Sequence, residues 1–390
     1  MIEHKIDYDI HGFLGVRLIN PSESDASAVA KQLGPMQKTL TAEPDIIVRF
    51  VDHLPLGKLN YLGLEKVGYN EEAFFILKSS KKDAKVQLAF DEIGERFEIL
   101  CESGLKSVPL LLAIINLSLL KKNVVALHAS AFVYNGKGIM VTGWAKGGKT
   151  EALLSFSDKG AEYVGDEWIF LSSDGKRMYG IPENIRLWDW HLDNLPRLKA
   201  KLSREKNLLF KGIHLLDKSQ NLGKKRLGRV FPLKYLREAM PALKRQLNVQ
   251  LPPQEVFDKC NESFSARFDK IFLLLSHNDS AYIVERTNPA EIADRMLASN
   301  QYELIPFMEN YMAYKFAFPK KQNKFIEKVP QIQSKLLLQA LLGKDAYTVR
   351  HPYPLSFDKL FEVMEPYCCE ERIEDVKENR NNVRKYEEVV

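Results

Sequence analysis

The sequence predicts an α/β protein with a mixed sheet, and three observations lead to that prediction. The first hundred residues contain short stretches in which apolar and polar residues alternate, separated by Asn, Asp, Gly and Pro, as is typical of strands. The middle of the chain has a strand-like run, a glycine-rich stretch and a helix-like run in succession. From Pro289 onward the apolar residues recur with helical spacing.

Residues 1–122 are predicted to form a strand-rich N-terminal domain closed by a helix. Its strand-like stretches are GFLGVRLI, DIIVRFV, AFFILKS, KVQLAF and RFEILC. The run VPLLLAIINLSLL, from Val108 to Leu120, is 13 residues long, whereas a membrane span needs roughly 20. We therefore expect a buried helix over about 105–122 and no membrane span. This domain would recognise a substrate, mediate assembly or complete the fold.

The stretch GWAKGGKT fits the pattern G-x-x-x-x-G-K-[ST] of a phosphate-binding loop. A predicted hairpin precedes it, formed by VVALHASAFVY, the turn NG and the strand KGIMVTG, and the helix-like KTEALLSFSDKG follows it. A phosphate-binding loop requires a strand before it and a helix after it, and the sequence predicts both. The residues predicted to bind the phosphates are Gly143, Trp144, Ala145, Lys146, Gly147, Gly148, Lys149 and Thr150.

Two predicted hairpins bring further polar side chains toward this loop. Counting outward from the turn at Asn135–Gly136 places His128 opposite Gly143. The same count from the next turn, DG, places Asp166 opposite Glu183. His128 would either bond a phosphoryl oxygen or set the protonation of a neighbouring carboxylate.

The acid pair Asp166–Glu167 ends a short strand soon after the helix that follows the loop. Phosphoryl transfer needs a cation that bridges the phosphates and an acceptor for the proton of the incoming hydroxyl, and carboxylates serve both needs. Two adjacent acids would divide these tasks. The pair would lie close to the loop if its strand neighbours the strand that enters the loop.

The stretch LHASAFVYNGKGIMVTGWAKGGKTEALLSFSDKGAEYVGDEW resembles the catalytic core of the HPr kinase/phosphorylase family, which has the phosphoenolpyruvate-carboxykinase-like P-loop fold. In that family a histidine precedes the loop and a pair of acids follows its helix, and His128 and Asp166–Glu167 occupy these places. The clear resemblance covers about residues 125–190, with weaker agreement to about Pro366. The nearest match to a further family signature is Glu183 and Arg186.

The resemblance implies a kinase that uses Mg²⁺ and a nucleotide. Asp166 would be the general base toward a hydroxyl, Lys149 would bind the phosphates, and His128 would assist there. Arg186 would hold a phosphoryl group, and the residues expected to hold the cation are Thr150, Glu167 and Glu183. The donor is expected to be ATP, with ADP and pyrophosphate as alternatives. The acceptor is left open between a serine of a protein or peptide and a small hydroxyl compound.

The predicted catalytic domain covers residues 123–366 and includes a basic segment, and a charged C-terminal tail spans 367–390. The basic segment, 197–245, has fifteen Lys and Arg against three acids. It supports an alternative function, a nucleotide-gated protein that binds nucleic acid or another polyanion. A solvated insertion or a lid over an acidic substrate would have the same composition. We further expect a cytoplasmic location, because the N-terminus lacks a secretory signal pattern. A homo-oligomer is expected as well.

Overall fold

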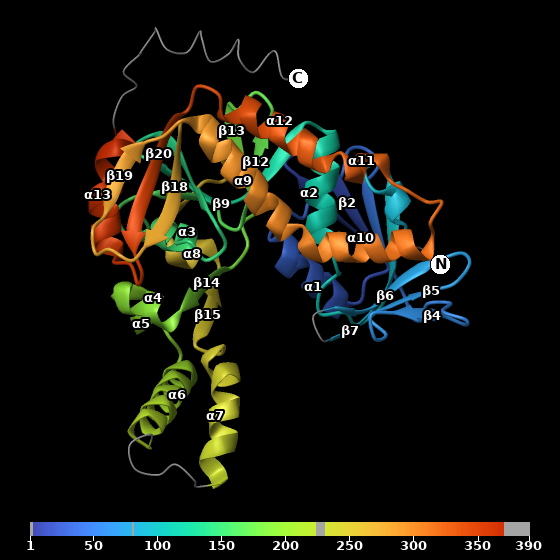
Figure 1. The fold of residues 1–390 in the computed structure, drawn as a ribbon, viewed down its shortest axis with the longest axis horizontal. Coiled ribbons are helices and arrows are strands. Elements are labelled where there is room, and N and C mark those ends of the chain that lie inside the picture. The colour runs from blue at the N-terminus through green and yellow to red at the C-terminus, as the bar shows by residue number, and fades with distance from the viewer. Residues whose placement is uncertain (1–2, 80–81, 224–230, 370–390) are drawn as a thin grey trace.

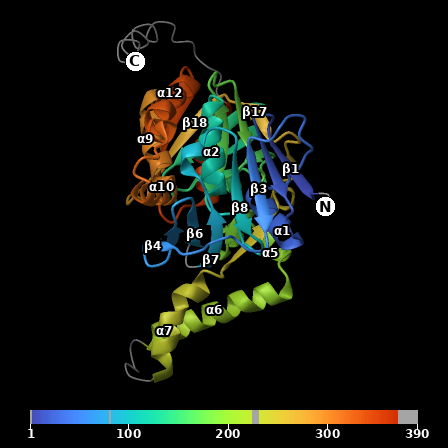
Figure 2. The ribbon, with the colours of Figure 1, turned by 90° about the vertical axis from the view of Figure 1, so that its right-hand side faces the viewer.

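The computed structural model describes residues 3–79, 82–223 and 231–369. These residues form two mixed sheets with helices packed on them, and a helical arm projects from the body (Figures 1 and 2). The predicted α/β class with a mixed sheet is therefore confirmed. Within the described residues, no helix has both the length and the apolar character that a membrane crossing requires.

The first sheet comes from the N-terminal part of the chain. Its described strands pair in the order β1-β2-β3-β8-β7-β6-β5-β4. They are β1 (Lys5–Ile10), β2 (Leu14–Ile19), β3 (Ile46–Val51), β4 (Asn60–Leu62), β5 (Val67–Tyr69), β6 (Phe74–Ser79), β7 (Lys82–Gln87) and β8 (Phe97–Glu102). All five predicted strands are present. Strands β1, β4 and β5 were not predicted.

Two helices accompany this sheet. Helix α1 (Glu23–Leu33) was not predicted, although Ser22 and Asp25 form a capping box at its start. Helix α2 (Leu111–Lys121) was predicted, but it begins later than expected. Proline disfavours helical geometry in the residue before it, so Pro109 keeps Val108 out of the helix.

The second sheet follows in the order β17-β13-β12-β9-β10-β18-β20-β19, with β11 beside β9 and β16 beside β11. Its described strands are β9 (Val124–Tyr134), β10 (Lys137–Gly143), β11 (Glu162–Gly165), β12 (Trp168–Ser172), β13 (Arg177–Gly180), β16 (Lys259–Cys260), β17 (Ser265–Arg267), β18 (Lys270–His277), β19 (Ile283–Arg286) and β20 (Asp345–Pro352). The predicted hairpin register is confirmed, because Tyr134 pairs with Lys137 and Ala129 with Thr142.

Two details of this sheet differ from the prediction. Strand β11, which leads to the acid pair, does not neighbour β10, because β9 lies between them and β18 pairs with β10 on the other side. The second hairpin has the predicted register, but its ladder ends at Ile169 and Gly180, so Asp166 and Glu183 are not a strand pair. Beyond this point Pro182 has no N–H with which to extend the ladder.

The predicted helical C-terminal region is confirmed. Its described helices are α9 (Pro289–Glu303), α10 (Ile305–Ala317), α11 (Lys324–Glu327), α12 (Val329–Leu341) and α13 (Phe357–Cys369). Helix α13 continues past the predicted domain end at 366, and 370–390 of the predicted charged tail lie outside the described residues. Strand β20 was missed, because the polar Thr348, Arg350 and His351 interrupt its apolar pattern.

A single hydrophobic cluster joins the two sheets. It contains Val48 and Ile99 from the first sheet, Ile115 from α2, and Leu127 and Ile271 from the second sheet. All five side chains are fully buried. On the opposite face of the second sheet, a separate cluster packs α3 (Lys149–Ser155) and α13 against the strands.

The arm leaves the body through a two-stranded ribbon of β14 (Ile185–Trp188) and β15 (Asn248–Leu251). Beyond it come α4 (Asp189–Asn194), α5 (Pro196–Ala200), α6 (Arg204–Gly223) and α7 (Phe231–Lys244), and α8 (Pro253–Val256) follows β15. Figure 2 shows α6 and α7 extending below the body. The described part of the basic segment is thus mainly helical, while its residues 224–230 lie outside the described residues. Strand β14 pairs with β15 in this ribbon and is not part of the second hairpin.

Candidate active site

The glycine-rich loop joins β10 to α3 at the end of the central strands. Gly148, directly before α3, has a φ of 99°, and a Cβ there would lie 3.2 Å from His351 Nε2. A Cβ on Gly143 would lie 2.8 Å from the carbonyl oxygen of Leu274. Both positions therefore require glycine, the first for its backbone conformation and the second for its close approach to β18.

Lys149 points back into the loop that precedes it. Its Nζ atom donates hydrogen bonds to the carbonyl oxygens of Trp144, at 3.0 Å, and Gly143, at 3.3 Å. The side chain is only 6% exposed. Burial lowers the pKa of Lys149, and the negative charges of Glu167 and Asp166 oppose that effect. The loop thus contains a buried ammonium group held by its own carbonyl oxygens.

Asp166 lies against the start of α3. The hydroxyl of Thr150 donates to the carboxylate of Asp166, with 3.0 Å between Oγ1 and Oδ2. Asp166 is 5% exposed, and its burial, followed by the charge of Glu167, raises its pKa to about 7. A carboxylate with a pKa near neutrality is well suited to accept a proton from a hydroxyl.

His128 lies between two carboxylates. Its Nε2 atom is 3.1 Å from Glu167 Oε2, and its Nδ1 atom is 2.8 Å from Glu303 Oε1. Ionised carboxylates only accept hydrogen bonds, so this geometry favours a doubly protonated ring. Burial lowers the pKa of His128, but the bonds to Glu167 and Glu303 outweigh it and the net pKa is raised. Of the two roles expected for His128, the geometry favours control of a neighbouring carboxylate.

Glu167 is positioned by an unusual backbone conformation. Its φ of 67° lies in the left-handed region, which costs free energy for any residue other than glycine. The hydrogen bond with His128 is the main cause of its lowered pKa, and the charges of Lys149 and Arg186 contribute in the same direction. Arg186 is exposed on β14, at the base of the arm.

Glu183 completes a group of three neighbouring carboxyl groups. Its burial, and then the charges of Glu167 and Asp166, raise the pKa of Glu183 to about 8. Its Oε1 atom is buried and has no hydrogen-bond partner among the described residues. Glu183 is therefore close enough for the charges of Glu167 and Asp166 to raise its pKa, although it does not pair with Asp166 in the hairpin.

The predicted cation ligands Thr150, Glu167 and Glu183 do not form a preassembled cage. Within the described part of the chain, no group of three or more His, Cys, Asp or Glu side chains is arranged to hold a metal ion. Mg²⁺ commonly uses only one or two carboxylates and takes its remaining ligands from water and substrate phosphates. Thr150, Glu167 and Glu183 fit this way of binding Mg²⁺, because they offer one hydroxyl and two carboxylates beside the loop.

The middle of the loop faces solvent. Ala145 is half-buried and Lys146 is exposed, with a φ of 62°. Trp144 is half-exposed, and its ring packs on Tyr302, with 4.8 Å between the ring centroids. The indole is therefore outside the buried core and is accessible beside the loop.

Two residues of the site were missed in the sequence. Glu303 ends α9, and His351 Nε2 on β20 lies 3.1 Å from the carbonyl oxygen of Gly147. Both are more than 150 positions from their partners, and they come from elements that reach the loop only through tertiary packing. No local pattern marks either of them.

A scan against protein-family models and a search of curated proteins gave no match for this chain.

Proposed function

We propose that this protein is a Mg²⁺-dependent kinase with an HPr-kinase-like P-loop fold. It would transfer the terminal phosphoryl group of ATP to a hydroxyl acceptor, which is either a serine of a polypeptide or a small hydroxyl compound. ADP and pyrophosphate are alternative donors. One observation carries the proposal: the hydroxyl that follows the loop lysine bonds to a buried carboxylate with a raised pKa.

The charges around the loop support a cation there. Asp166, Glu167 and Glu183 repel one another, which contributes to the raised pKa values of Asp166 and Glu183. The orphaned Oε1 atom of Glu183 adds an unused acceptor. Thr150, Glu167 and Glu183 would hold the ion, and bound Mg²⁺ would neutralise charge on the phosphates.

Each residue then has a distinct task in the proposed reaction. Asp166 takes the proton of the acceptor hydroxyl as that oxygen attacks the terminal phosphorus atom, and the bond from this atom to the bridging oxygen breaks, so that ADP leaves. Lys149 turns from its loop carbonyls to the phosphate oxygens, and backbone N–H groups of the loop bind them. His128 holds Glu167 in place, and Arg186 offers a charge for the phosphoryl group.

The first experiment follows label from γ-labelled ATP, with Mg²⁺, into the protein, nucleic-acid and small-molecule fractions of a cell extract. Replacing Asp166→Asn should lower transfer by about 10²–10⁴-fold, because that is the usual contribution of a general base. Lys149→Ala should lower it as well. The exposed Asp294→Asn and Lys320→Ala are matched controls that should transfer label normally. Undiminished transfer with both site variants would contradict the proposal.

A second candidate function rests on the basic arm. Figure 1 shows α6 and α7 standing clear of the sheets, where they could bind a polyanion. Binding through Lys and Arg to phosphates would weaken steeply as salt rises. However, Leu208 and Leu215 of α6 are each 69% exposed, and leucine gains nothing from contact with phosphate. A salt titration of RNA and DNA binding, with and without ATP, tests this candidate, and salt-insensitive binding would count against it.

A further inference from the structure

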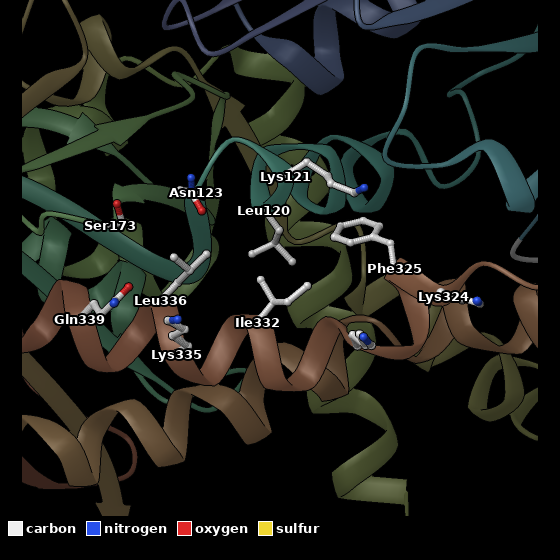
Figure 3. A pocket seen from close by; sticks show the side chains of 11 residues that line it. Leu120, Lys121, Asn123, Ser173, Lys324, Phe325, Ile332, Lys335, Leu336 and Gln339 are labelled. Atoms are coloured by element: carbon white, nitrogen blue, oxygen red, sulfur yellow. The ribbon is translucent and has the colours of Figure 1, made fainter. Parts of the chain in front are cut away.

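A cavity of about 680 Å³ lies beside the end of α2, on elements other than the glycine-rich loop. Its walls come from the end of α2, the turn into β9, the end of β12, and helices α11 and α12. Figure 3 shows Leu120, Ile332 and Leu336 converging in its centre, with Phe325 at one end. Asn123, Ser173 and Gln339 lie toward the other end. The cavity thus has an apolar floor and one polar end.

Its charged groups are all cationic. Lys121, Lys324, Lys328 and Lys335 line it, and no acidic residue does. Lys121 is paired with Glu95, at 3.1 Å, and its Nζ atom also lies 4.8 Å from the centre of the Phe325 ring. For the remaining three lysines, no acidic partner exists among the described residues.

Glu327, the acidic residue beside these lysines in the sequence, does not neutralise their positive charge. Glu327 lies between Lys324 and Lys328 in the sequence, but its carboxylate is paired with Lys315, at 2.7 Å. Unpaired like charges around an apolar concavity repel one another and raise the local concentration of anions. The cavity volume is also in the range of sites for small organic ligands.

We propose that this cavity binds an amphiphilic organic anion. The apolar body of the ligand would lie against Leu120, Ile332 and Leu336, and its phosphate or carboxylate head would face Lys328 and Lys335. This site is separate from the candidate active site, so it stands whether or not the protein is a kinase. It adjoins Asn123, where α2 turns into β9, and β9 then leads to His128.

The test uses 8-anilinonaphthalene-1-sulfonate, a fluorescent anion with an apolar body, titrated into the full-length protein. Octyl phosphate and octanoate are the competitors. Inorganic phosphate tests the anionic head alone, and octyl glucoside tests the apolar body with an uncharged head. Each octyl compound is used below its micelle-forming concentration. We expect one or both of the octyl anions to displace the probe much better than either half. Equal displacement by octyl glucoside or by inorganic phosphate would overturn the proposal. The stronger octyl anion identifies the head group.

A double variant, Lys328→Gln with Lys335→Gln, locates the site. It should weaken probe binding by about tenfold or more, because it removes both of the charges that would face the anionic head of the probe. The matched control Lys320→Gln with Lys359→Gln removes two exposed lysines that do not line the cavity. All four lysines are exposed, so both proteins should fold, which circular dichroism can verify. Equal affinity in the double variant and the wild type would refute this location.

Discussion

His128 shows how tertiary contacts define the role of a single residue. The β9–β10 ladder runs as far as Ala129 and Thr142, so His128 is the next residue along β9, and Trp168 on β12 is its ladder partner. Its charge state depends on Glu167 and Glu303, which approach the two ring nitrogens from different elements. Only Glu167 could be suspected from the sequence, because Glu303 is 175 residues away.

Replacing Glu303→Gln should lower the pKa of His128. The glutamine oxygen can still accept a hydrogen bond from Nδ1, but the negative charge that favours the protonated ring is gone. Protonation of His128 stabilises the fold below its unfolded pKa, and that contribution is lost as the pH rises through the raised folded pKa. The variant should therefore lose about 1 kcal/mol of stability at pH values below the unfolded pKa of His128. An NMR titration of the histidine ring measures the shift, with the exposed Glu309→Gln as control. An unchanged titration would show that Glu303 does not set the charge of His128.

At the scale of elements, the parts that could be predicted are those set by local spacing. The strand, loop and helix around Gly143–Thr150 follow from turn residues, alternation and capping over a few positions. The same rules gave the register of the hairpin at Asn135–Gly136. They could not place β20 beside β18, because a parallel pair depends on a crossover connection rather than on a turn.

The requirement for glycine at the start of α3 can be tested against a second glycine. Gly148 and Gly160 both have positive φ values, 99° and 86°, but a Cβ would meet neighbouring atoms only at Gly148. Gly160→Ala should cost about 1 kcal/mol for the backbone alone, and Gly148→Ala about 2 kcal/mol or more because contact strain is added. Urea denaturation measures both costs, and only Gly148→Ala should weaken the proposed binding of ATP. Equal costs would show that the contacts with His351 and Leu355 are easily relieved.

The pairing of β1 with β2 should depend on pH through Asp7. Arg17 lies opposite Asp7 and donates two hydrogen bonds to its carboxylate, which lowers the pKa of Asp7. This contribution to stability is present above the unfolded pKa of about 4 and is lost as the pH falls through the folded value. Asp7→Asn should therefore cost about 1–2 kcal/mol at pH 7, and less at pH 3. Urea denaturation at both pH values checks this, with the exposed Asp52→Asn as control. A cost that did not change with pH would contradict the assignment.

At the scale of the whole molecule, the sequence predicts a domain boundary near residue 122, and the described strands of the first sheet all precede this residue while those of the second sheet follow it. The extent of contact across that boundary was not predictable. Residues such as Ile99 and Leu127 belong to one hydrophobic cluster although they lie in different sheets. Periodicity tells which face of an element is buried, but it does not tell which other element covers that face.

The shared cluster predicts that the two sheets unfold together. All four tryptophans lie after residue 122, so tryptophan fluorescence reports on the second sheet and the base of the arm. Ile99→Ala, a fully buried change in β8, should cost about 2–5 kcal/mol and lower the fluorescence midpoint in urea. Far-UV circular dichroism should give the same midpoint. Ile283→Ala, on the exposed side of β19 in the second sheet, should leave both signals almost unchanged. If Ile99→Ala shifted only the circular dichroism signal, the sheets would be independent folding units, and the shared cluster would be a docking contact between them.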